Sequence, residues 1–250
     1  MITEPFAFGN SWIHRIDPRL KIFFATIYSF IVALSDRFPA LLAGLAISTG
    51  LVVMARLDIR QVAGRLAVVS GFLLLLWMVL PLTYEGPVMY SPGPIAFSRP
   101  GVILSARITL KSISILLAFM ALVATMTFAT LGHALDRLHL SGKLVHLFLL
   151  TYRYIFVIEQ EYQRLLRAAR MRSFRPGTDM HSYKTYAYII GMLFVRASAR
   201  ARRVHDAMIC RGFKGRFYCL HEFRSTGIDR FFMILMILIS AGLIYMQWIY

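Results

Sequence analysis

Long apolar runs alternate with short polar segments along the whole chain, and this alternation most restricts how it can fold. Five runs are long enough, or nearly so, to cross the ~30 Å hydrocarbon core of a bilayer as helices. They cover residues 22–34, 39–55, 66–82, 113–131 and 231–249, and Lys111 borders the fourth. Because the first three are short for a crossing, we expect flanking residues to extend them. The pattern predicts an all-α integral membrane protein with about five transmembrane helices.

Charges in the short loops predict the orientation of these helices. The N-terminal arm and loop 56–65 are net positive, whereas Asp36 and Arg37 cancel, as do Glu85 and Arg99. Positive loops stay in the cytoplasm, so we expect a cytoplasmic N-terminus and an external C-terminal tip. Residues 1–20 lack the apolar core of a cleaved signal peptide, so the first helix is expected to direct membrane insertion.

The loop between the third and fourth apolar runs is rich in glycine and proline. Its turn-forming pairs and triplets are Gly86-Pro87, Pro92-Gly93-Pro94 and Pro100-Gly101. Such sequences predict turns rather than a further crossing.

A strongly basic segment extends from Gly132 to Arg230, with 18 Lys and Arg against 7 Asp and Glu. The net charge of +16 would suggest nucleic-acid binding in a soluble protein. Basic residues beside apolar runs instead follow the positive-inside rule, so we expect no nucleic-acid partner. We predict an N-terminal membrane domain with four helices (1–131), a cytoplasmic domain (132–228) and a C-terminal transmembrane helix (229–250).

Residues 144–158 leave one alternative open. They are mostly apolar but include His146 and Arg153, and a central arginine costs about 2.5–3.5 kcal/mol on insertion. We therefore expect an interfacial or protein-covered helix. A sixth crossing is the alternative, and it would place the basic segment outside.

Two long amphipathic helices are predicted within the cytoplasmic domain. The first has an apolar face of Ile155, Ile158, Tyr162, Leu165, Leu166 and Ala169. The second has a heptad-like seam of Ile190, Phe194, Ala197, Ala201, Val204 and Met208. Because two alanines occupy its centre, we expect another helix to cross closely at Phe194, Ala197, Ala201 and Val204.

The two helices end in matching sequences. The first ends at Met171-Arg172-Ser173-Phe174 and the second at Cys210-Arg211-Gly212-Phe213, each followed by helix-breaking residues. A cation is favourable at the negative end of a helix, and a small neighbour leaves the guanidinium free to reach a partner. The simpler alternative is a pair of helices whose arginines face water or anionic headgroups.

At these residues the sequence resembles the transmembrane T component of energy-coupling-factor (ECF) transporters, of the CbiQ/NikQ type. That family carries two Ala-Arg-Gly signatures at the ends of its cytoplasmic coupling helices. Here Met171-Arg172-Ser173 and Cys210-Arg211-Gly212 occupy those places; neither has the alanine, and only the second keeps the glycine. The similarity extends to His14–Lys21, Leu193–Arg196 and Ala207-Met208.

The resemblance implies a non-catalytic subunit of an ATP-driven importer in a bacterial or archaeal inner membrane. Its partners would be two ATPase subunits, which bind ATP and Mg, and one membrane S component. Each coupling helix would dock on one ATPase through the residues around Arg172 and Arg211. The transported ion, cobalt or nickel, would be bound by the S component, so this chain needs no cofactor.

Other functions are less consistent with the residues. A phosphate-binding loop is missing, because Leu144 follows Gly142-Lys143 and Arg137 occupies the position of the earlier glycine. The seven histidines lack the HxxxH and HExxH spacings of metal sites, and Cys210 and Cys219 form no CxxC pair. A vitamin-type T component, an ordinary ABC permease and, remotely, a membrane-embedded enzyme are the alternatives.

Overall fold

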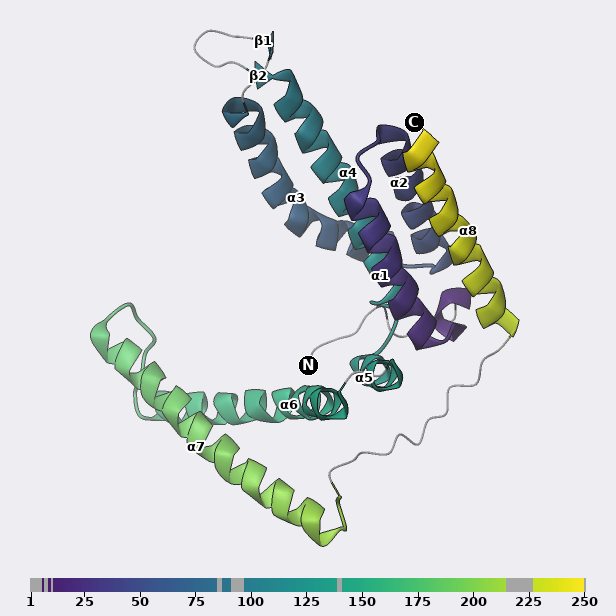
Figure 1. Ribbon diagram of the computed structural model, residues 1–250. Helices are drawn as coiled ribbons and strands as arrows, with labels where there is room; N and C mark the ends of the chain where they lie inside the picture. Colours follow the sequence, from purple (N-terminus) through teal and green to yellow (C-terminus); the bar gives the residue numbers. More distant parts are fainter. Residues whose placement is uncertain are drawn as a thin grey trace. The chain divides into compact units, whose positions relative to one another are not determined.

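The chain folds into two compact units, shown in a computed structural model that describes residues 6, 9, 11–84, 87–90, 97–138, 141–214 and 227–249 (Figure 1). The membrane unit comprises residues 3–131 and 223–250, and the basic unit comprises 132–222 with 1–2. The membrane unit contains η1 (Trp12–Arg15), α1 (Pro18–Leu34), α2 (Phe38–Met54), α3 (Ile59–Thr83), β1 (Val88–Tyr90), β2 (Phe97–Ser98), α4 (Arg99–Leu122) and α8 (Gly227–Ile249). The remaining helices are α5 (Phe128–Arg137), α6 (Gly142–Met171) and α7 (Met180–Cys210).

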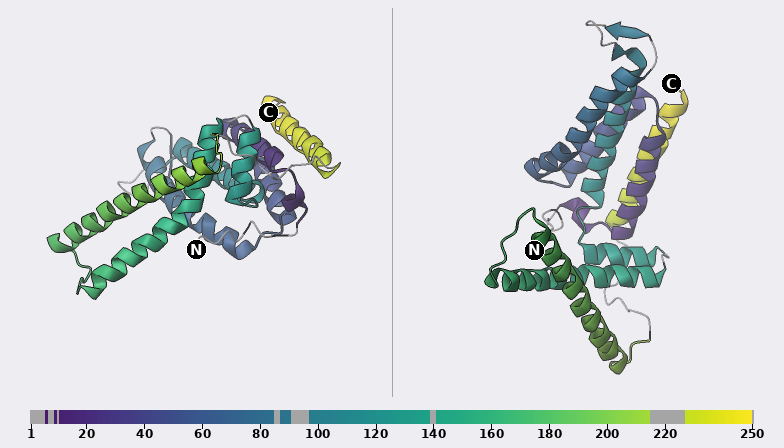
Figure 2. Two further views of the ribbon diagram at one scale, coloured as in Figure 1. Left: turned by 90° about the horizontal axis from the view of Figure 1, so that it is seen from below. Right: turned by 90° about the vertical axis from the view of Figure 1, so that its left-hand side faces the viewer.

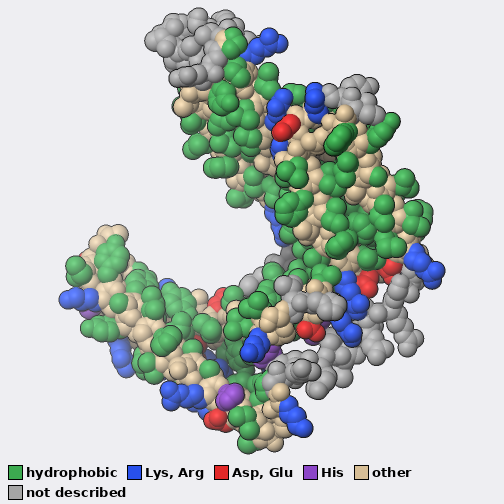
Figure 3. All heavy atoms as spheres, viewed as in Figure 1, with side chains coloured by type: hydrophobic (Ala, Val, Ile, Leu, Met, Phe, Trp, Pro, Cys, Tyr) green, Lys and Arg blue, Asp and Glu red, His purple; other side chains and the backbone are tan. Residues whose placement is uncertain are grey.

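Long apolar helices dominate the membrane unit. Among the described residues, α3, α4 and α8 are long and apolar enough to cross a membrane, and α2 is a shorter apolar helix. Hydrophobic side chains cover much of the face of this unit that Figure 3 shows, and Val68 on α3 is 80% exposed. A bilayer covers such a surface. The prediction of an all-α membrane protein is confirmed, with the antiparallel pair of β1 and β2 as a short β element.

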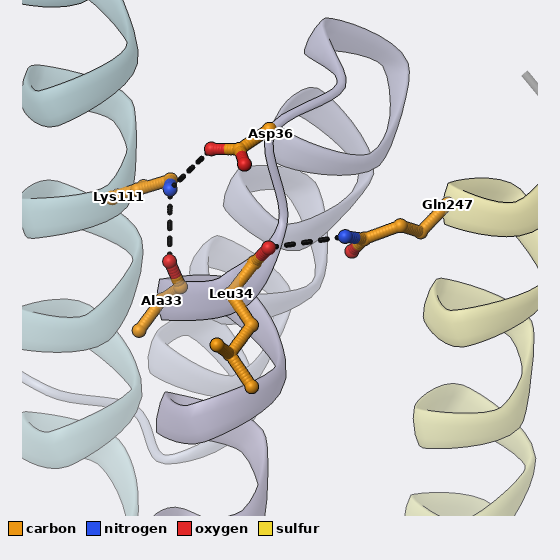
Figure 4. Close-up of polar contacts among 5 residues, drawn as sticks. All are labelled: Ala33, Leu34, Asp36, Lys111 and Gln247. Carbon is orange, nitrogen blue, oxygen red and sulfur yellow. Dashed lines mark hydrogen bonds and ion pairs between the residues drawn. The ribbon is translucent and has the colours of Figure 1, made fainter.

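The helices alternate in direction, which Figures 1 and 2 show for α1 to α4. The Asp17 amide donates to Asp229 Oδ1 over 2.8 Å, which joins the starts of α1 and α8. Gln247 Nε2 donates to the Leu34 carbonyl over 3.0 Å, which joins their ends (Figure 4). The helices α1 and α8 are therefore parallel. Since α4 runs in the opposite direction to α1, α4 ends at the face of the membrane unit where α8 begins.

Side-chain caps determine where several of these helices begin. Asp17 accepts a hydrogen bond from the Arg19 amide over 2.9 Å, and Asp58 accepts one from the Arg60 amide over 3.1 Å. Both carboxylates also lie at the positive end of a helix dipole. The core that these helices enclose includes fully buried Tyr28, whose hydroxyl donates to the Gly44 carbonyl.

The predicted fourth span, residues 113–131, is wrong at both ends. The helix α4 begins at Arg99 and ends at Leu122, and a turn separates it from α5. Lys111, expected at the border of the span, lies within this helix. Its ammonium group donates to the Ala33 carbonyl over 2.8 Å and to Asp36 Oδ1 over 3.0 Å (Figure 4). An ammonium with two acceptors is tolerated where an unpaired one is not.

Pro100-Gly101, predicted as a turn, instead forms the first turn of α4. The Ser98 hydroxyl caps this turn by accepting from the Gly101 amide over 3.3 Å. A Cβ at Gly101 would lie 2.7 Å from the Leu80 carbonyl oxygen, so glycine lets α4 approach α3 closely. The other predicted turn residues, Gly86 and 92–94, lie outside the described residues, as do Glu85 and Cys219.

The basic unit contains the two long helices predicted from the sequence, joined by a short hairpin loop. Near that loop Leu166, Phe174 and Ile189 are buried together, with Tyr162, Leu165, Ala169 and Tyr186 packed around them. This confirms the second half of the apolar face predicted for the first helix. Residues 144–158 lie within α6, which is not among the helices long and apolar enough to cross a membrane.

The predicted crossing seam on α7 lies away from this packing. Phe194 is 75% exposed and Ala201 is exposed, whereas Ala197 and Val204 are half-buried. The contact of α7 with α6 near the hairpin is made one turn or more earlier, at Tyr186 and Ile189. A close crossing of the seam by another helix therefore stays a prediction.

Candidate functional site: two matching helix ends

The helices α6 and α7 end in the same hydrogen-bonding arrangement. At the first end the Phe174 amide donates to the Ala169 carbonyl over 3.1 Å, and the Ser173 amide donates to the Arg170 carbonyl over 3.0 Å. At the second end the Phe213 amide donates to the Met208 carbonyl over 3.0 Å, and the Gly212 amide donates to the Ile209 carbonyl over 2.9 Å. Both sets are the paired bonds of a Schellman motif. The similarity predicted from sequence therefore extends to the backbone.

A left-handed residue closes each motif. Ser173 has φ +65° and Gly212 has φ +78°. Glycine adopts this conformation freely, whereas for a residue with a Cβ it costs about 1–2 kcal/mol. Ser173 is thus the position where the sequence departs from the glycine of the Ala-Arg-Gly signature, although the backbone there keeps the shape that glycine favours.

A phenylalanine follows each left-handed residue and anchors the helix end to the rest of the basic unit. Phe174 is 8% exposed, and its ring packs edge-on against Tyr186 with the centroids 5.5 Å apart. Phe213 is half-buried and stacks on the His146 ring of α6, with the centroids 5.8 Å apart. Each aromatic side chain therefore turns inward, next to a cap residue that turns outward.

The two arginines are the exposed cap residues. Arg172 is the C-cap of α6 and Arg211 is the C-cap of α7, and both side chains are exposed. Among the described residues neither guanidinium has a hydrogen-bond or ion-pair partner. Met171, beside Arg172, is 88% exposed, and Cys210, beside Arg211, is an exposed free thiol. A planar guanidinium next to exposed apolar surface is suited to bidentate contact with a partner.

The loop after the first end is held by a small polar cluster that sequence reasoning missed. The Ser182 hydroxyl donates to Asp179 Oδ1 over 2.7 Å and accepts from the Gly177 amide over 3.0 Å. The hydrogen bond from Ser182 lowers the pKa of the Asp179 carboxyl below its ordinary value. The sequence spacing could have predicted this cluster, because Asp179 is followed three residues later by Ser182 at the start of a helix, where such side chains bond to each other and to the local backbone.

Both helix ends offer an exposed cation that is suited to recognition of a partner. Within the described ranges, no group of three or more His, Cys, Asp and Glu side chains could hold a metal ion. Fold and site together define an integral membrane protein that carries two long helices with arginine-capped ends.

The chain belongs to the CbiQ family, described as "Cobalt transport protein", whose model matches residues 9–219. It is similar to the energy-coupling factor transporter transmembrane protein EcfT of Leuconostoc gelidum subsp. gasicomitatum, with 25% identity over 82% of this chain and 81% of the relative. The EcfT of Bacillus subtilis is 26% identical over 86% of this chain and 85% of the relative. The cobalt transport protein CbiQ of Salmonella typhimurium is 27% identical over 61% of this chain and 71% of the relative.

Proposed function

We propose that this chain is the T component of an ECF-type importer, a non-catalytic subunit that transmits the motion of ATPase partners to a substrate-binding S component. The observation that carries the proposal is the repeated Schellman end with its exposed arginine. Two equal surfaces on one chain suit two equal partners, and a pair of ATPase subunits provides them. ATP and Mg would be bound by those partners, and the transported substrate by the S component.

The distribution of charge supports a cytoplasmic site for the two helix ends. The start of α1, the loop between α2 and α3, the end of α4 and the start of α8 lie at one face of the membrane unit (Figure 1). Arg19, Arg56 and Arg60 lie at this face. Positive residues gather on the cytoplasmic side of inner-membrane proteins, which is where ATP is available to partner ATPases.

Cobalt or nickel ion is the substrate we propose first. The family description and the Salmonella relative both name cobalt transport. The names of the EcfT relatives give no substrate, and a vitamin-type importer is therefore the second candidate. Identification of the S component that co-purifies with the chain in mild detergent would distinguish between the two substrates.

Substitution of both arginines tests the proposal. In a reconstituted complex of this chain with its ATPases and S component, Arg172→Ala and Arg211→Ala should each lower ATP-driven uptake about tenfold or more. Loss of a charged contact at a buried interface costs about 2–5 kcal/mol, which corresponds to at least that factor. Membrane insertion should be unchanged, because both side chains are exposed.

Matched controls come from the same two helices. Arg167→Ala on α6 and Arg202→Ala on α7 remove exposed arginines that lie five and nine residues before the capping arginines, and they should retain uptake. Wild-type uptake by the Arg172→Ala, Arg211→Ala double variant would rule the proposal out. Activity towards a substrate by the purified chain alone would favour a membrane enzyme instead.

A further inference from the structure

An ion-pair cluster joins the second half of α6 to the middle of α7, away from both helix ends. Arg196 Nη1 of α7 donates to Glu161 Oε1 of α6. Arg164, one turn further along α6, lies 3.6 Å from Glu161 Oε2. The Glu161 side chain is only 14% exposed, whereas Arg196 is 47% exposed. One covered carboxylate therefore receives two guanidinium groups from two helices.

The position of this cluster matters because α7 separates the two signature arginines. Arg172 precedes the start of α7 and Arg211 follows its end. At 1.5 Å per residue, the 31 residues of α7 separate these ends by about 46 Å. The two phenylalanines hold the ends of α7, through the buried cluster around Phe174 and through the stack of Phe213 on His146. Arg196 lies between these two anchors, seven residues after Ile189 and 17 residues before Phe213.

The part of α7 on both sides of Arg196 exposes large apolar side chains. Phe194 and Val195, just before it, are 75% and 59% exposed, and Ile209, near the end of the helix, is 55% exposed. The buried cluster that packs α7 on α6 lies nearer the hairpin, around Phe174 and Ile189. Between the two anchored ends, the ion pair of Glu161 with Arg196 joins the two helices.

Charge around the cluster explains why a carboxylate is needed there. Arg164 belongs to α6, and Arg196 and Arg200 belong to α7, so without an acid the facing surfaces would repel each other. The hydrogen bond from Arg196 lowers the pKa of the Glu161 carboxyl, and the charges of Arg196, Arg164 and Arg200 act in the same direction. The carboxylate is thus ionised throughout the physiological pH range.

We propose that Glu161 is a positioning residue that makes α6 and α7 move as one rigid body. It holds the midpoint of α7 against α6, so that displacement of the Arg211 end reaches α6 and the Arg172 end. The inference rests on the proposed coupling function and adds a named residue to it. Loss of Glu161 should therefore uncouple the transporter: ATP hydrolysis continues, while substrate uptake falls.

The test measures uptake per ATP hydrolysed in the reconstituted complex. Glu161→Gln and Arg196→Gln should each lower this ratio roughly threefold or more, as expected for a partly screened ion pair. The Glu161→Gln, Arg196→Gln double variant should be no worse than either single variant, because both remove one interaction. Glu159→Gln removes an exposed acid of the same helix and should keep the wild-type ratio.

A distance measurement on the full-length chain in detergent gives an independent readout. Spin labels at native Cys210 and at an introduced Gln163→Cys, in a Cys219→Ser background, report the separation of α7 and α6. Glu161→Gln should broaden the distribution of distances, whereas Glu159→Gln should not. If Glu161→Gln cannot be purified, Arg196→Gln removes the same ion pair from the other helix and should broaden the distribution equally.

Two results would overturn the inference. One is a wild-type ratio with a wild-type distance distribution in Glu161→Gln or Arg196→Gln. The other is additive loss in the double variant, which would mean that the two side chains act separately. If Arg172→Ala and Arg211→Ala impair uptake while Glu161→Gln does not, the inference fails and the proposed function stands. If the arginine variants have no effect, the proposed function itself fails.

Discussion

The ends of α6 and α7 share one backbone arrangement but reach it by different means. At the second end Gly212 occupies the left-handed position without steric cost. At the first end Ser173 occupies it at a cost of about 1–2 kcal/mol, and buried Phe174 with the Asp179–Ser182 cluster holds the loop in place. A helix end can therefore be specified either by its own residue or by its surroundings. The two ends should accordingly respond differently to the same substitution.

Removal of the anchoring phenylalanine should give the largest difference between the ends. Truncation of a buried Phe to Ala costs about 3–5 kcal/mol, and Phe174 is buried whereas Phe213 is half-buried. Phe174→Ala should therefore open the last turn of α6 more than Phe213→Ala opens that of α7. Hydrogen exchange of the amides in the two turns measures both effects. Equal loss of protection would mean that the surroundings do not hold the first end.

A reciprocal exchange of the left-handed residues should have an intermediate effect. Ser173→Gly removes backbone strain, and Gly212→Ser introduces it in open space, since nothing lies within 4 Å of a Cβ at Gly212. We expect stabilisation of the first end and destabilisation of the second, each by about 1 kcal/mol. Exchange protection of the two terminal turns should shift in opposite directions. Destabilisation by Ser173→Gly would contradict the difference inferred between the two ends.

Acidification should have the smallest effect, and it should act at the second end. Burial lowers the pKa of His146, on which Phe213 stacks, below the ordinary value of 6.5. A lowered histidine pKa means that this contribution to stability is complete above pH 6.5 and declines as the pH falls through the folded-state pKa. Protection of the last turn of α7 should thus decrease as the pH falls below about 6.5. His146→Gln should abolish that dependence; a pH-independent wild type would contradict it.

The sequence was sufficient for the features that depend on composition and local order. Apolar runs predicted the all-α membrane fold, and the repeated Arg-small-Phe order predicted that two long helices would end alike. These features follow from short-range physics, because helix length and end geometry are decided within a few residues. Leu165, Leu166 and Ala169 were also predicted correctly to share an apolar face, and they pack in the cluster with Phe174 and Ile189.

Features that depend on distant partners could not be predicted from the sequence. Lys111 was predicted to border the fourth transmembrane helix, because a charged side chain was not expected inside it. Its acceptors, Ala33 and Asp36, come from another helix and the loop after it, and they could not be foreseen. The placement of α4 was wrong for that reason. Sequence analysis did not single out Glu161, because its partner Arg196 is 35 residues away. Long-range pairing of charges leaves no periodic pattern in a single sequence.

The parallel arrangement of α1 and α8 has a consequence for biosynthesis. Phe232 and Met236 of α8 are 1% and 0% exposed, and they fill the core between helices made much earlier. A ribosome completes the whole basic unit before it produces these two side chains. Until then the apolar surface that α8 later covers is exposed to lipid or to chaperones. The membrane unit is therefore the last to complete its core, although most of it is translated first.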